Sequence, residues 1–295
     1  MMYAVIFRFA HILLILSNIF IFCECFAIAE ESSDELNTIL MRSTYKIEGI
    51  SKEREGALTT GTVFMLGRPS RIDSKYLYFV LVTATHVLDG IKGDKATLYL
   101  RKKIDNSYEK IPTEIPIRKE NKDLWVRHSE VDVSAMYVHL PKDIDISLLS
   151  INFLADDGVF KDVELHPGDE LLCLGYPFSM EANQAGFPIL RSGKIASFPI
   201  LPTKEVKSFL YDFEVFGRNS GGPVYFIQTG RFYRGEIHVY QKNQFIVGLV
   251  SEERIIVEKN VMTDEYREKQ RPLKLAVVIP ASFIKETIEL LPSIE

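Results

Sequence analysis

Cysteine is scarce in this chain of 295 residues, which contains only three. Cys23 and Cys25 lie in the apolar amino-terminal segment, and removal of that segment would leave Cys173 without a partner for an internal disulfide. The mature chain must then be stabilised by its hydrophobic core, which its length permits. Cys173 itself lies in the apolar run 171–174, which predicts a buried, inert thiol in a strand rather than a nucleophile.

A basic excess is also missing, because the formal net charge is −5 at pH 7. Nucleic-acid-binding surfaces need positive charge against the phosphates, so the sequence predicts no nucleic-acid partner. Metal-binding spacings such as H-E-x-x-H do not occur around His128, His139, His166 or His238. The sequence therefore predicts neither a metal site nor a cofactor.

The amino terminus differs from the rest of the chain. Ile12 to Phe22 form an apolar run with two polar interruptions, and Ala27-Ile28-Ala29 is a small-x-small cleavage motif followed by polar residues. This layout predicts a signal peptide at residues 1–29 and a secreted or periplasmic mature protein with no membrane span. The alternative is an uncleaved membrane anchor, for which the apolar run is short.

Helical periodicity is nearly absent before the carboxyl terminus. Short apolar segments recur instead between turn residues such as Pro167-Gly168-Asp169, a pattern typical of barrels and sandwiches. A single amphipathic helix closes the chain, with Ser282 as its expected cap and Pro292 as its stop. The predicted organisation is an amino-terminal extension at 30–41, a first β-barrel at 42–150, a connection at 151–164, a second β-barrel at 165–280 and a helix at 281–292.

Three residues in separate segments form a candidate catalytic set. His86 follows an apolar strand, Asp132 opens another strand candidate, and Ser220 stands before two glycines. A base, an orienting carboxylate and a nucleophile are the groups that serine acyl transfer requires. Each motif alone is more often a turn or a structural residue, but their occurrence together in this order favours catalysis.

These residues carry a resemblance to the chymotrypsin-fold, trypsin-like serine proteases, and within them to the disulfide-poor type exported by bacteria. The matching motifs are Thr83-Ala84-Thr85-His86, Asp132-Val133-Ser134-Ala135 and Asn219-Ser220-Gly221-Gly222-Pro223. The order His, Asp, Ser is also that of the chymotrypsin type. The resemblance covers roughly residues 42–292. It implies an all-β fold of two six-stranded antiparallel barrels with a carboxyl-terminal helix.

The resemblance also implies a function and roles for individual residues. The protein would be a serine endopeptidase that cleaves polypeptide substrates through an acyl-enzyme. Ser220 would be the nucleophile, His86 the general base and Asp132 its orienting group, with Ser251 supporting Asp132. The backbone amides of Arg218 and Ser220 would form the oxyanion hole.

Arg218 departs from the family pattern, which has glycine two residues before the serine. A strained non-glycine residue there costs about 1–3 kcal/mol. One expectation is that the Gly217–Arg218 peptide relaxes by flipping, so that the oxyanion hole is poorly formed at rest. The other is that Arg218 fits an allowed conformation because Gly217 absorbs the turn. The sequence leaves both open.

Acidic residues near the expected substrate site suggest a specificity. Glu214 stands six residues before Ser220, where trypsin-like members of the family carry a pocket carboxylate. Glu252 and Glu253 add negative charge next to Ser251. We therefore expect cleavage after a basic or polar residue.

A second function class remains open from the sequence. The same barrel fold can serve as a catalytically silent module that binds polypeptides. Labelling with a fluorophosphonate, which reacts with an activated serine, distinguishes the two functions. The oligomeric state is not predicted.

Overall fold

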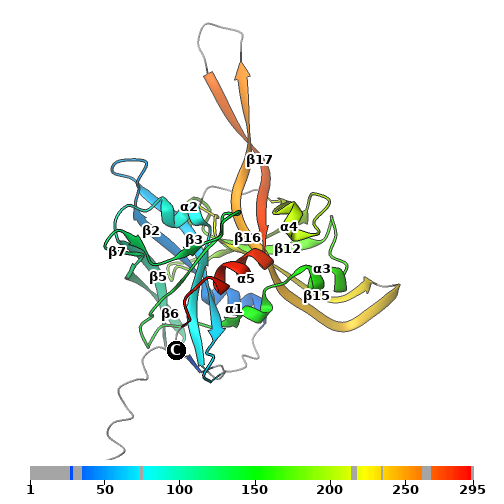
Figure 1. Cartoon of the computed structure of the whole chain (residues 1–295), viewed down its shortest axis with the longest axis horizontal. Coiled ribbons are helices and arrows are strands. Elements are labelled where there is room, and N and C mark those ends of the chain that lie inside the picture. Colours follow the sequence, from blue (N-terminus) through cyan, green and yellow to red (C-terminus); the bar gives the residue numbers. More distant parts are fainter. Residues whose placement is uncertain are drawn as a thin grey trace, which may run out of the picture.

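The computed structural model describes residues 27–28, 35–73, 76–213, 218–233, 235–260 and 267–293 (Figure 1). Strands predominate in it, forming a nine-stranded sheet in the first half and a closed six-stranded antiparallel barrel in the second. A helix ends the described chain. The expected all-β class, with an antiparallel barrel and a carboxyl-terminal helix, is confirmed.

The first sheet has the strand order β6-β5-β2-β3-β4-β10-β9, with β1 added to β4 and β11 added in parallel to β3. The almost continuously apolar strand β4 lies inside this sheet between β3 and β10. The strands are β1 (Ala27–Ile28), β2 (Thr44–Ile50), β3 (Leu58–Pro69), β4 (Tyr76–Thr83), β5 (Lys95–Ile104), β6 (Ser107–Pro116), β9 (Val126–Arg127), β10 (Ser134–Tyr137) and β11 (Leu149–Ser150). A separate ribbon pairs β7 (Arg118–Lys119) with β8 (Lys122–Asp123).

The second half closes in the order β12-β13-β14-β17-β16-β15. Its strands are β12 (Glu170–Gly175), β13 (Ile189–Ile195), β14 (Phe209–Asp212), β15 (Pro223–Tyr233), β16 (Glu236–Asn260) and β17 (Arg267–Pro280). The ribbons β15–β16 and β16–β17 run far beyond the barrel as two arms (Figure 1). Cys173 lies buried in β12, and burial raises the pKa of its thiol to about 12, as expected for an inert cysteine.

The helices are α1 (Leu36–Ser43), α2 (Thr85–Asp89), α3 (Asp157–Asp162), α4 (Thr203–Val206) and α5 (Ala281–Glu289), with 3-10 turns η1 (Ile151–Phe153) and η2 (Pro177–Ser179). In α1, which the sequence did not predict, Leu36, Ile39, Leu40 and Ser43 are buried. This spacing of three and four residues places one face of α1 on the core of the first sheet.

Helix α5 connects the two halves, because Phe283, Ile284 and Ile288 join the hydrophobic core of the first sheet. The prediction that Ser282 caps this helix is wrong. Pro280, the last residue of β17, occupies the cap position without a side-chain cap. Ser282 lies inside the first turn and donates to Thr203 Oγ1 at 3.0 Å.

Most of the predicted signal peptide lies outside the described residues. The exception is β1, part of the predicted cleavage motif, which pairs with Leu77 and Tyr76 of β4. Among the described helices, none combines the length and the apolar character that crossing a bilayer requires.

Candidate active site

His86 lies where β4 ends and the chain turns into α2. Ala84 occupies the amino-terminal cap of α2, and Val87 and Leu88 are buried below it. The His86 side chain itself remains 52% exposed. The short helix therefore presents the imidazole to solvent from a support that is packed into the core.

Asp132 lies in the loop between β9 and β10 and binds His86 twice. Asp132 Oδ2 lies 2.7 Å from His86 Nδ1, and Oδ1 accepts a hydrogen bond from the His86 backbone N–H at 3.1 Å. Ser251 Oγ, from β16, donates to Oδ2 at 2.6 Å. Because a carboxylate only accepts hydrogen bonds, Nδ1 must carry the proton, and the lone pair of the neutral ring is then on Nε2.

The pKa values of this pair move in opposite directions. Burial alone lowers the pKa of His86, but the hydrogen bond and charge of Asp132 outweigh it and raise the pKa above 6.5, helped by the charges of Glu252 and Asp89. Burial alone raises the pKa of Asp132, but its hydrogen bonds to His86 and Ser251 hold the pKa below 3.8. Both shifts favour the charged pair, so Asp132 stabilises the imidazolium.

The Ser220 loop is fixed between the two halves by backbone contacts. Thr62 N donates to Ser220 O at 2.9 Å, and Gly221 N donates to Val250 O at 2.7 Å. Gly221 has φ of +87°, and a Cβ there would lie 2.1 Å from Thr62 O and from Thr83 Oγ1. The close approach explains the glycine. It also places Ser220 beside the strand end that leads to His86.

The Ser220 hydroxyl makes no hydrogen bond to any described residue. The structure therefore joins His86, Asp132 and Ser251 directly, and holds Ser220 nearby through its backbone. In resting enzymes the bond between nucleophile and base is often long and tightens with substrate.

Arg218 takes the backbone conformation that glycine prefers, with φ of +87°. Its carbonyl accepts a hydrogen bond from Thr62 Oγ1 at 3.1 Å, and its Nη1 donates to Ser179 Oγ at 2.7 Å. The backbone N–H groups of Arg218 and Ser220 donate to no acceptor in the described part of the chain. Gly217, which the second expectation invoked, lies outside that part.

The expected acidic residues are placed only in part. Glu252 is exposed, 3.5 Å from Arg254, and its charge contributes to the raised pKa of His86. Glu214 lies outside the described residues, as does the side chain of Glu253. The preference for a basic or polar residue before the cleaved bond stays a prediction.

Two supports of the site were not found from the sequence. Thr62 binds both Arg218 and Ser220, although it is 156 residues before Arg218. Ser179 binds the Arg218 guanidinium from the turn η2. Neither contact follows a local spacing rule, so only an assembled structure reveals them.

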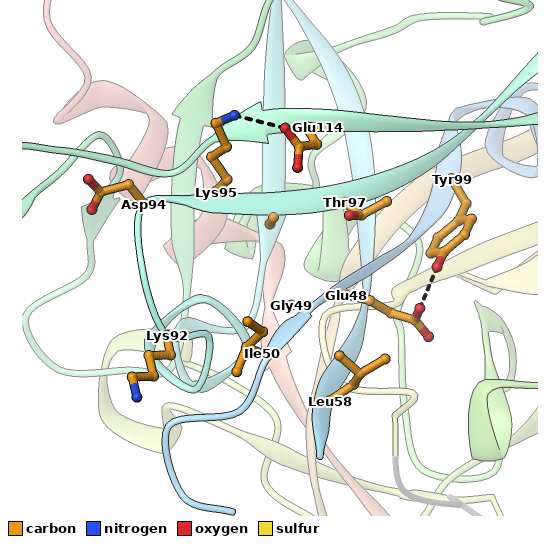
Figure 2. Close-up of a pocket in the computed structure, with 11 residues that line it drawn as sticks. Glu48, Gly49, Ile50, Leu58, Lys92, Asp94, Lys95, Thr97, Tyr99 and Glu114 are labelled. Atoms are coloured by element: carbon orange, nitrogen blue, oxygen red, sulfur yellow. Dashed lines mark hydrogen bonds and ion pairs between the residues drawn. The ribbon is translucent and has the colours of Figure 1, made fainter. Parts of the chain in front are cut away.

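A separate pocket opens between β2 and β5 (Figure 2). The two strands pair only as far as Glu48, opposite Thr97, and then diverge. Within the pocket, the Tyr99 hydroxyl donates to Glu48 at 2.6 Å, and Lys95 pairs with Glu114 at 2.8 Å. The three candidate catalytic residues do not line it.

No family model matches the chain, and no curated protein matches it. Solved structures with a similar arrangement include the protease Anisep from Arthrobacter nicotinovorans, at 11% identity and a TM-score of 0.45, covering 84% of this chain and 94% of that chain. The Rv3671c protease from M. tuberculosis, in its active form, has 15% identity and a TM-score of 0.41, covering 90% of each chain. The thermostable serine protease AL20 from an extremophilic microorganism has 10% identity and a TM-score of 0.42, covering 84% of this chain and 95% of that chain.

Proposed function

We propose that this protein is a serine endopeptidase that cleaves polypeptides. The observation that carries the proposal is the hydrogen-bonded set of His86, Asp132 and Ser251, with the Ser220 loop fixed beside it. His86 is a base held in one orientation by the Asp132 carboxylate, and Ser220 offers a hydroxyl next to two glycines. These are the groups that acyl transfer requires.

In the proposed first step, Ser220 Oγ attacks the carbonyl carbon of the peptide bond while His86 Nε2 takes its proton. The carbonyl oxygen becomes an oxyanion, for which the amides of Arg218 and Ser220 are the donors. The tetrahedral intermediate collapses to an acyl-enzyme when His86 gives the proton to the leaving amine. Water then attacks the acyl-enzyme by the same route and releases the acid product.

The alternative of a silent binding module has one observation in its favour. The Ser220 hydroxyl has no hydrogen-bond partner among the described residues, so the structure holds it in place only through its backbone. A silent module would bind peptides without reacting with a fluorophosphonate. Labelling of Ser220 therefore separates the two functions.

Activity should rise with pH as His86 loses its proton. Because the base must be neutral and its pKa is raised above 6.5, the acid limb of kcat/KM should have its midpoint above 6.5. Glu252→Gln removes a charge that contributes to this raised pKa, so its midpoint should move to lower pH. Glu114→Gln, an exposed glutamate paired with Lys95, is the matched control and should leave the midpoint in place. Maximal activity well below the histidine range would contradict the mechanism.

We also propose that the mature chain begins at Glu30 after export. The supporting feature is the motif Ala27-Ile28-Ala29 behind an apolar run. The intact mass under non-reducing conditions should match residues 30–295 with one free thiol, from Cys173. A mass that includes residues 1–29 would favour the anchored form, in which β1 stays in the chain and paired with β4.

A further inference from the structure

Arg218 has a positive φ, and an arginine adopts that conformation only where contacts stabilise it. At φ of +87°, an arginine pays a steric penalty that glycine avoids. Its carbonyl is held by Thr62 Oγ1, but that contact fixes the peptide on the carboxyl side of the residue. The peptide on its amino side carries the N–H proposed for the oxyanion, and its direction depends on φ. Some contact beyond Thr62 should therefore hold φ in the left-handed region.

The side chain of Arg218 supplies such a contact. Its Nη1 donates to Ser179 Oγ at 2.7 Å, although the guanidinium is exposed to solvent. A charged donor makes a stronger hydrogen bond than a neutral one. The contact reaches back from the Ser220 loop to the turn η2, which follows β12 in the same half of the chain.

Ser179 lies in a turn that is itself strained and anchored. Phe178 and Ser179 both have positive φ, at +51° and +63°. Ser179 N donates to Tyr176 O at 2.9 Å, which closes the turn. Tyr176 is completely buried, and the single proton of its hydroxyl lies within reach of two carbonyl oxygens, Gly186 O at 3.0 Å and Thr44 O at 3.2 Å. The hydroxyl that binds Arg218 is therefore carried by a turn attached to the core.

The buried side chain of Arg101 links residues 176–187, the segment that carries Ser179, to the first half of the chain. Arg101 is fully buried, and its guanidinium lies 4.3 Å from the ring centroids of Tyr45 and Phe187. Its Nη groups donate to four backbone carbonyls, those of Met41, Arg42, Thr44 and Gly186. A buried charge with this many partners resists displacement, because breaking its contacts would leave it unpaired. Both ends of segment 176–187, which carries Ser179, are thus attached to the first half of the chain.

We propose that Ser179 is a positioning residue of the active site. By binding the guanidinium of Arg218, it holds that residue in the left-handed conformation and so keeps the Arg218 N–H available to the oxyanion. The proposal rests on the proposed peptidase function. Ser179 touches no reacting atom in this account and acts only through Arg218.

Substitutions of Ser179 distinguish the effect of its hydroxyl from the effect of its backbone conformation. Ser179→Gly removes the acceptor but tolerates positive φ, so the turn should survive. Ser179→Asn retains an acceptor and tolerates the left-handed region. With a peptide p-nitroanilide as substrate, Ser179→Gly should lower kcat about three- to tenfold with KM unchanged, since the oxyanion contact forms only in the transition state. Ser179→Asn should restore most of the rate.

Substitutions at 218 test the link between side chain and backbone. Arg218→Ala loses the guanidinium but keeps the steric penalty at positive φ, whereas Arg218→Gly loses both. The alanine variant should therefore have a kcat at least about threefold below that of the glycine variant. In the Arg218→Gly background, Ser179→Gly should change kcat by less than about twofold, because glycine has no guanidinium for the Ser179 hydroxyl to bind.

The control is Ser107→Ala, an exposed hydroxyl bound to Ile104 O in the β5–β6 turn, which should behave as wild type. Thermal melts of all variants establish that they are folded. An active wild type with full kcat in Ser179→Gly, or equal rates for alanine and glycine at 218, would overturn the role of Ser179 and leave the peptidase function standing. A wild type that is folded but inert would overturn both.

Discussion

Ser220→Ala should lower peptide hydrolysis by about 10⁴- to 10⁶-fold and leave the thermal melt unchanged. The rate falls because the proposed nucleophile is lost. The melt is preserved because the loop is held by backbone contacts, from Thr62 N to Ser220 O and from Gly221 N to Val250 O. The hydroxyl has no described partner whose loss could weaken the fold.

A second substitution shows whether Ser220 acts as one unit with His86. Residues of a catalytic unit are strongly non-additive, so His86→Ala added to Ser220→Ala should cost little more. Ser51→Ala is the matched control, since its hydroxyl accepts backbone hydrogen bonds from Glu53 and Arg54 in an exposed turn. Undiminished turnover in Ser220→Ala would remove Ser220 from the mechanism.

Asp132→Asn should lower kcat/KM by about 10³- to 10⁴-fold, measured above the titration range of His86. The substituted amide can donate a hydrogen bond to His86 Nδ1. The proton of the neutral ring would then move to Nε2, where it blocks acceptance of the serine proton. The thermal melt should change far less than the rate, because the substitution preserves shape.

Ser251→Ala is the informative comparison for Asp132. It removes one hydrogen bond of 2.6 Å to the carboxylate but leaves the charge and both contacts with His86. The expected loss is about tenfold or less. If Asp132→Asn were no more damaging than Ser251→Ala, the carboxylate would not be setting the tautomer of His86.

Local motifs in the sequence were enough to name candidate site residues. His86 after an apolar strand, Asp132 before one and Ser220 between turn residues were named in this way, and the structure joins His86 to Asp132 by hydrogen bonds. The catalytic role of the three residues stays a prediction. Ser251 was named through the resemblance, and its hydroxyl binds Asp132. The all-β class followed from the short apolar segments and their turns.

The remaining features depend on contacts that no local pattern encodes. Arg218 at positive φ runs against residue preference, so propensity alone would not place it there. Thr62 and Ser179 support it from 156 and 39 residues away. The prediction that Ser282 caps α5 was wrong because Pro280, the last residue of β17, occupies the cap position. Tertiary packing decided each of these.

Fluorophosphonate labelling of the folded wild-type protein, followed by peptide mapping, shows whether Ser220 is an activated nucleophile. The oxygen of an activated serine loses its proton to the base, attacks the phosphorus and displaces fluoride, so that the serine retains the phosphonyl group, whereas ordinary serines do not react. We expect one modified residue, Ser220, with labelling abolished in His86→Ala. A folded protein that remains unlabelled, or is labelled at another serine, would contradict this expectation.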